Sequence, residues 1–228
     1  MKFIEAKTWK ERGLQVQNVK DKCNAIISAL NLQDDDIRTQ GMIHVRQCCN
    51  TLAAIPIKLQ QNAEIPQNVP LIMEILGLSD ASSLELVLKD LNANAKVSFL
   101  TVVQFALENS AKQVVETLSG QAAPIRFKKI VENLIDLTGI SSSQNKQNKL
   151  DLLLVLAYLR NTLHANGVHR KPDVTIMVDG EAFVFEQDKR IDCASWSHIL
   201  FALYHSLSVY EEMYLSPTVK AVTFIGTI

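Results

Sequence analysis

The chain has 228 residues, of which 47% are hydrophobic and 21% are charged, with eight glycines and six prolines. This composition excludes a disordered or collagen-like chain, and the scarcity of glycine and proline favours helices over a β-sandwich. The formal net charge of −1 excludes a general electrostatic attraction of the whole chain to nucleic acids or anionic membranes.

The N-terminal part of the chain predicts two helices. Apolar residues recur at intervals of three and four over residues 14–31, as on one face of an amphipathic helix. The acidic run 34–36 supplies an N-cap for a second helix, which is predicted to end at Pro56. Ionisable side chains of this second helix are expected to face solvent, and they are Arg38, His44 and Arg46.

Residues 56–70 contain three prolines and show no helical period, so a loop is expected there. The same stretch is the best place for a boundary. We therefore expect a single domain, residues 1–228, and keep the alternative that an N-terminal helical hairpin, residues 1–56, packs on a core made by residues 71–228.

Two further helices are predicted in the middle of the chain, after a short apolar helix over residues 71–77. Ser82 and Glu85 have the spacing of a capping box at the start of the first, near 83–92. The second is expected over residues 96–118, where Gly120 just beyond its end is a plausible stop.

Another amphipathic helix is expected between Pro124, in its first turn, and Gly139, just past its end. The polar residues 141–149 then read as a connection. The next helix, about 147–165, is apolar on all sides over most of its length, which is typical of a buried central helix.

The last part of the chain combines a hairpin with a long helix. Asp179-Gly180 is a two-residue turn between β-prone runs, which predicts one β-hairpin at about 174–185. A final long helix is expected over residues 195–215, ended by Pro217. The apolar tail 218–228 is expected to add a strand or to cover a partner subunit. The predicted fold is therefore mainly α, a helical bundle with one β-hairpin before the last long helix.

Charge is spread unevenly along the chain. Residues 126–171 carry eight basic and three acidic side chains, a net charge of +5, whereas residues 172–228 carry three basic and eight acidic ones, a net charge of −5. Either the basic segment forms a local site for an anion or phosphate, or the two segments face each other in the fold.

The four cysteines have no metal-binding or redox spacing, and we expect them to be buried and reduced. No Gly-rich phosphate loop, HExxH or GxSxG occurs, so neither a metal nor a cofactor is expected. The N-terminus lacks the apolar core of a signal peptide and no run approaches the roughly 20 apolar residues of a membrane span, so we expect a cytoplasmic location.

A polar cluster stands at the end of the apolar helix. Arg160 and His164 are four residues apart and project from one face of a helix. Asn166-Gly167 is a good C-terminal cap, and His169 and Arg170 follow in the loop before the hairpin. A guanidinium and an imidazole in this arrangement suit phosphate binding and proton transfer, as needed when a 2′-hydroxyl attacks its own phosphate in RNA.

The run Arg160-Asn161-Thr162-Leu163-His164, continuing to Asn166-Gly167, resembles the signature of the HEPN superfamily, helical-bundle domains found in many prokaryotic toxins, antiphage proteins and RNA-cleaving enzymes. The three residues enclosed between Arg160 and His164 are fewer than the family usually has. The resemblance implies a metal-independent endoribonuclease of a toxin or phage-defence system, with Arg160 and His164 catalytic. Asn161, Asn166, His169 and Arg170 would help to bind RNA or a nucleotide.

Active relatives place the motifs of two subunits together, so the resemblance also implies a homodimer, and an antitoxin or another protein as a further partner. The alternative is a non-catalytic, dimeric helical interaction module. In that case Arg160 bonds to loop carbonyls, Asn161 holds the hairpin and His164 caps its helix.

Overall fold

The computed structural model describes residues 2–140 and 145–226 and confirms a mainly helical fold with one antiparallel hairpin before the last long helix. The elements in chain order are α1 (Trp9–Leu30), α2 (Ile37–Cys48), the π-helical η1 (Cys49–Ala54), α3 (Ile55–Ala63), the 3₁₀ turn η2 (Pro66–Asn68), α4 (Val69–Leu76), α5 (Ala81–Ser119), α6 (Phe127–Thr138), α7 (Lys146–His164), β1 (Val174–Val178), β2 (Glu181–Phe185), α8 (Trp196–Tyr214) and α9 (Pro217–Lys220).

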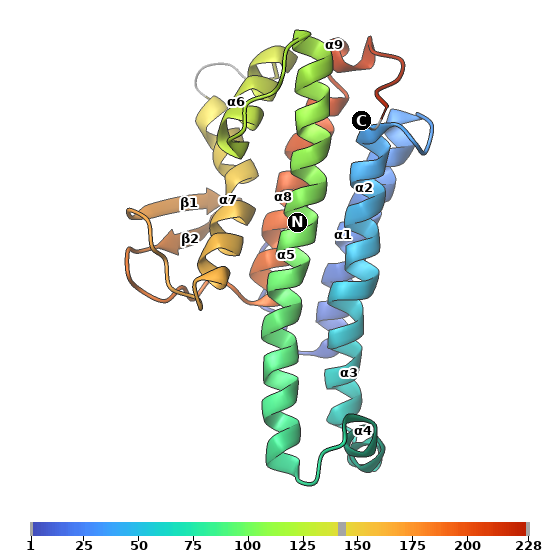
Figure 1. Cartoon of the computed structure of the whole chain (residues 1–228), viewed down its shortest axis with the longest axis vertical. Coiled ribbons are helices and arrows are strands. Elements are labelled where there is room, and N and C mark those ends of the chain that lie inside the picture. The colour runs from blue at the N-terminus through green and yellow to red at the C-terminus, as the bar shows by residue number, and fades with distance from the viewer. Residues whose placement is uncertain (1, 141–144, 227–228) are drawn as a thin grey trace.

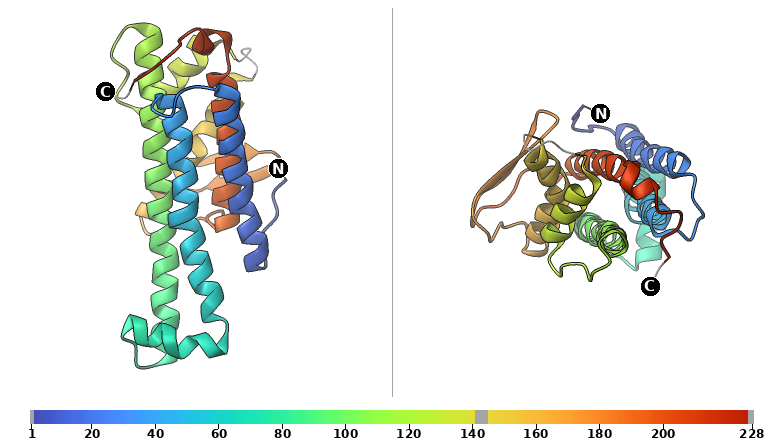
Figure 2. Two further views of the ribbon diagram at one scale, coloured as in Figure 1. Left: turned by 90° about the vertical axis from the view of Figure 1, so that its right-hand side faces the viewer. Right: turned by 90° about the horizontal axis from the view of Figure 1, so that it is seen from above.

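The helices form a bundle around α5, which runs the full height of the molecule in Figure 1. It packs against α2 on one side and α6 and α7 on the other, while α8 packs between α1 and α7. Seen from above in Figure 2, the hairpin lies beyond α7, on the side away from α1 and α2. One cluster of buried apolar residues joins the N-terminal helices to the hairpin and to α8.

The helix predicted to stop at Pro56 does not stop there. The chain continues from α2 through η1 into α3, whose first turn holds Pro56. Proline lacks an N–H and crowds the preceding turn, but it is tolerated where a helix starts afresh, here after the widened π turn. The expected loop over residues 56–70 is therefore wrong, since α3, η2 and the start of α4 occupy nearly all of it.

The two helices predicted over residues 83–92 and 96–118 are one continuous helix, α5. No glycine or proline occurs between Ala81 and Ser119, so nothing in the chain breaks it. The N-cap is Asp80, whose side chain accepts a hydrogen bond from the Ser83 N–H, so the capping box at Ser82 is also wrong. Gly120 ends α5 with a positive φ of 66°, as predicted.

The later boundaries agree more closely with expectation. Helix α6 starts at Phe127, slightly later than predicted, and Gly139 follows its last residue with a φ of 63°. Helix α7 begins at Lys146, within the stretch expected to be a connection, whose residues 141–144 lie outside the described part of the chain. Eight of its side chains are buried, in keeping with a central helix.

The hairpin has the predicted turn and register. Val174 pairs with Phe185 and Ile176 with Phe183, so these four residues share the face that packs toward α7. Asp179 and Gly180 both have positive φ, 45° and 88°, as a type I′ turn requires. The opposite face of the hairpin is exposed.

The apolar tail is described up to Gly226, and this part forms no strand. It packs against the start of α2. Pro217 opens the short helix α9, after which the tail returns to the start of α2. The Ile37 N–H donates to the Ile225 carbonyl (2.9 Å), and the Ile225 N–H donates to Oδ2 of Asp36 (3.0 Å). Tail residues 217–226 therefore pack on their own chain.

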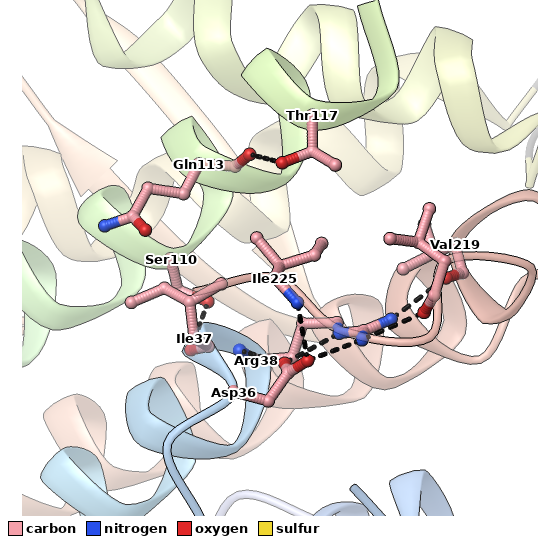
Figure 3. A network of polar contacts seen from close by, with 9 residues as sticks. Asp36, Ile37, Arg38, Ser110, Gln113, Thr117, Val219 and Ile225 are labelled. Atoms are coloured by element: carbon pink, nitrogen blue, oxygen red, sulfur yellow. Dashed lines mark hydrogen bonds and ion pairs between the residues drawn. The ribbon is translucent and has the colours of Figure 1, made fainter. Parts of the chain in front are cut away.

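A buried ion pair fixes this junction (Figure 3). Arg38, expected to face solvent, has only 1% of its surface exposed and donates through Nε and Nη2 to Asp36 at 2.8 and 2.6 Å. Its Nη1 and Nη2 also donate to the carbonyls of Val219 and Val222. Burial acts to raise the pKa of Asp36, but the hydrogen bonds from Arg38 and Ile225 outweigh it and lower that pKa.

Candidate functional site

The C-terminal end of α7 carries the side chains that the sequence singled out. The buried, apolar part of α7 ends at Leu159, and the next turn emerges beside the middle of α5. Arg160 is partly exposed and His164 is exposed. Because they are one helical turn apart, both side chains leave α7 on the same face.

His164 is held by α5. Its Nε2 lies 3.0 Å from Oγ1 of Thr101, whose own hydroxyl hydrogen is directed to the carbonyl of Val97 (2.8 Å). The Thr101 oxygen is then left to accept, so the hydrogen-bond network assigns the proton of neutral His164 to Nε2. In this tautomer Nδ1 is a lone-pair acceptor, as a general base must be.

Arg160 has no acidic partner in the described part of the chain. Its Nε and Nη2 both point to Oδ1 of the neighbouring Asn161, at 3.3 and 3.1 Å. No carboxylate of the described residues lies within ion-pair distance, so the guanidinium keeps donors for an external anion. Asn161 itself is exposed, and its amide oxygen is used by Arg160.

His169 is placed differently. It is buried at 3% exposure, with Nδ1 3.1 Å from Oγ1 of Thr162 and Nε2 3.2 Å from the carbonyl oxygen of Pro172. A carbonyl only accepts, so Nε2 donates to Pro172 and Nδ1 accepts from Thr162. Both ring nitrogens are occupied, and the ring also contacts Tyr158 and Phe185. His169 thus ties the loop after α7 to the hairpin.

The remaining two predicted binding residues lie on the surface of the same loop. Asn166 has a positive φ of 56° and precedes Gly167, whose N–H donates to the carbonyl of Thr162 at 2.9 Å. This turn closes the end of α7, as expected of a helix cap. Arg170 forms an exposed ion pair with Asp188 at 2.9 Å.

The ion pairs bear on the uneven charge of the sequence. Two basic side chains of residues 126–171, Lys149 and Arg170, pair with acidic ones of residues 172–228, Glu212 and Asp188. Lys128 and Lys129 pair with Glu132 within the basic segment. Lys146 also pairs with Asp136, so five of the eight basic side chains are in ion pairs. Only two of them pair with residues 172–228, so the two segments face each other only in part. Arg126, Arg160 and Lys171 form no ion pair among the described residues.

The cysteines offer no competing reactive group. All four cysteines are buried and free, as predicted, and burial raises the pKa of Cys49 to about 12 and that of Cys193 to about 11. Among the described residues no group of three or more His, Cys, Asp or Glu side chains is arranged to hold a metal ion. No described helix has the length and apolar character needed to cross a membrane.

Sequence reasoning missed Thr101, which lies 63 positions before the histidine that it holds. It occurs in an apolar helical run, and only the packing of α5 on α7 brings the two together. The chain matches no family model, no curated protein and no solved structure.

Proposed function

We propose that this chain is a HEPN-like, RNA-directed protein, a metal-independent endoribonuclease in a toxin or phage-defence system. The observation that carries the proposal is the pair at the end of α7. Arg160 offers a guanidinium that has no acidic partner among the described residues, and His164 presents Nδ1 from an exposed ring held by Thr101. When a 2′-hydroxyl of RNA attacks the adjacent phosphate, the site must bind the phosphate and take up a proton. Arg160 and His164 would supply both at one solvent-accessible place.

In the proposed reaction Nδ1 of His164 takes the proton of the 2′-hydroxyl, and the 2′-oxygen attacks the adjacent phosphorus. Arg160 binds the non-bridging oxygens, on which negative charge grows. The bond from phosphorus to the 5′-oxygen breaks, and a second imidazole, His164 of the partner subunit, gives that oxygen a proton. The products are a 2′,3′-cyclic phosphate and a 5′-hydroxyl, so the reaction needs neither water nor a metal.

The proposal includes a cytoplasmic, homodimeric protein, with an antitoxin or another protein as a further partner. Buried free thiols are compatible with a reducing compartment. Asn161, Asn166 and Arg170, all exposed near the pair, would contact RNA outside the scissile phosphate. His169, with both nitrogens occupied, would act by holding their loop.

The test is cleavage of 5′-labelled single-stranded RNA in the presence of EDTA. We expect wild-type protein to give fragments ending in a 2′,3′-cyclic phosphate. His164→Ala should lower the rate by at least about 100-fold, the usual size of an acid–base contribution. Arg160→Ala should lower it by a similar factor, because it removes the group that stabilises charge on the phosphate oxygens. Neither variant should change the melting temperature much. Arg46→Ala, an arginine of α2 that bonds to Asn24, is the matched control and should cleave normally.

The second candidate is the non-catalytic, dimeric interaction module. It is favoured by large apolar side chains left exposed on the surface, such as Phe105 and Ile125. Under this function Arg160→Ala and His164→Ala would unfold the protein or dissociate the dimer, and no preparation would cleave RNA. The two candidates therefore differ in both readouts, stability and cleavage.

A further inference from the structure

A groove opens on α5 close to the candidate pair at the end of α7. Helices α5 and α7 run in opposite directions (Figure 1), and His164 meets α5 at Thr101. Phe105 is one turn further along α5 and Arg160 is one turn earlier in α7, so these two residues lie at about the same level. Phe105 is 70% exposed and lines the groove, which therefore begins beside the guanidinium that would bind phosphate.

Two sides of this groove are apolar. Phe105 of α5 lies on one side, and Pro124 and Ile125 of the segment before α6 lie on the other. Ile125 is 97% exposed, so its own chain hardly covers it. The volume of about 320 Å³ is at the lower end of the range for small-ligand pockets, about 300–1,000 Å³. A flat aromatic ring placed between these two sides would cover both.

Further along α5 the lining of the groove is polar. Glu108 lines it, and its carboxylate forms no hydrogen bond or ion pair among the described residues. Lys112, one turn later, pairs instead with Glu116 at 4.0 Å. Asn109 accepts a hydrogen bond from Gln113 through Oδ1 (3.3 Å), which leaves its Nδ2 as a donor for a ligand. The groove thus offers two acceptor oxygens and, from the next residue, a donor.

Guanine carries the complementary set of groups on its Watson–Crick edge. Its N1–H and N2–H are adjacent donors, which a carboxylate accepts as a bidentate pair, and its O6 accepts from an amide. Adenine, cytosine and uracil each present one donor group on this edge, next to a ring or carbonyl acceptor. Such a base would leave a carboxylate oxygen desolvated and unpaired, which is unfavourable.

We propose that this groove binds a guanine of single-stranded RNA, next to the phosphate held by Arg160. The base stacks on Phe105, as unpaired bases of RNA do on aromatic side chains, and Ile125 covers its other face. Glu108 accepts from N1–H and N2–H, and Asn109 donates to O6. The inference rests on the proposed function and specifies its substrate, RNA cut beside guanines. None of the groove residues touches the reacting atoms, so they determine specificity and position.

The test measures binding of RNA that cannot be cut. Short fluorescein-labelled oligonucleotides carry 2′-fluoro in place of each 2′-hydroxyl and hold a single guanine, adenine or cytosine among uracils. Fluorescence anisotropy with the full chain should show the guanine oligonucleotide bound at least about tenfold more tightly than the others. Glu108→Gln, which replaces one acceptor oxygen by a donor, should remove this preference. Phe105→Ala should weaken binding of every oligonucleotide about tenfold, since stacking tolerates any base.

Glu85→Gln and Leu86→Ala are the matched controls, because both residues are exposed near the start of α5, and both variants should bind as wild type does. Circular dichroism checks that each variant is folded. Absence of binding, equal affinity for all bases, or a guanine preference that survives Glu108→Gln would overturn the inference.

The cleavage assay separates this inference from the proposed function. Cleavage that depends on Arg160 and His164 but occurs beside all four bases would leave the ribonuclease standing and overturn the guanine site. Guanine-specific binding by a protein that cuts no RNA would support the site and overturn the catalytic proposal.

Discussion

Replacing Arg38 by methionine tests whether the buried ion pair holds the tail on the start of α2. The substitution keeps the length of the side chain but leaves the carboxylate of Asp36, 0% exposed, without its cation. Removing one partner of a buried ion pair costs about 3–5 kcal/mol. For a chain of this size about 4 kcal/mol corresponds to a fall in melting temperature of about 8–16 °C.

The dependence on pH gives a sharper form of the same prediction. In the wild type the folded pKa of Asp36 is lowered, so its stabilisation is present above the unfolded pKa, about 4, and is lost as pH falls through the folded value. Without Arg38, burial dominates and the folded pKa is raised. A raised pKa means that protonation favours the folded state, so the variant regains stability as pH falls from 7 toward 4.

Urea unfolding followed by circular dichroism at pH 7 and pH 4.5 measures both effects. The stability gap between wild type and Arg38→Met should be about 4 kcal/mol at pH 7 and smaller at pH 4.5. Arg46→Met on the same helix is the control, with an expected cost below about 0.5 kcal/mol. A gap under about 1 kcal/mol at pH 7, or one that does not change with pH, would refute the reasoning.

Three further sets of predictions concern glycines, cysteines and a partly buried histidine. Gly13→Ala should stabilise the protein by about 0.5–1 kcal/mol, because Gly13 lies in the second turn of α1 and no atom stands within 4 Å of a new Cβ. Gly41→Val should destabilise it by about 1–3 kcal/mol, since even a Cβ there lies 3.1 Å from Cβ of Ser110. Thermal melts compare the two variants. A thiol reagent should label none of the four cysteines until the protein unfolds. Burial lowers the pKa of His198 in the folded state, despite two nearby carboxylates. The free energy of unfolding should therefore decrease as pH falls below about 6.5, the pKa of an unfolded histidine. Urea unfolding of His198→Gln should not show this decrease.

Local patterns were sufficient for α7 and the hairpin. An uninterrupted apolar run identifies a central helix, and Asp179-Gly180 between β-prone runs fixes both the turn and the pairing of Ile176 with Phe183. In each case the determining residues are close together in the sequence. The same holds for the glycines that end α5 and α6.

The misjudged features depend on partners far away in the sequence. Pro56 is an exception, because the π turn that lets the helix continue lies directly before it. Arg38 appears solvent-facing because Val219 and Val222 are about 180 residues later. Thr101 carries no signal at all. The two candidate catalytic residues were predictable as a pair, but the support that orients His164 was not.

The attachment of the tail to α2 bears on how this chain folds. Arg38 binds main-chain carbonyls, so it accepts Val219 and Val222 with little regard to their side chains. During synthesis, however, the start of α2 leaves the ribosome long before Val219 and Val222 are added. Until then the guanidinium of Arg38 remains solvated. Contacts over such a sequence separation slow folding, since a very long loop has to close before they form. We therefore expect the burial of Arg38 to come late in folding, because it cannot precede the synthesis of Val219 and Val222.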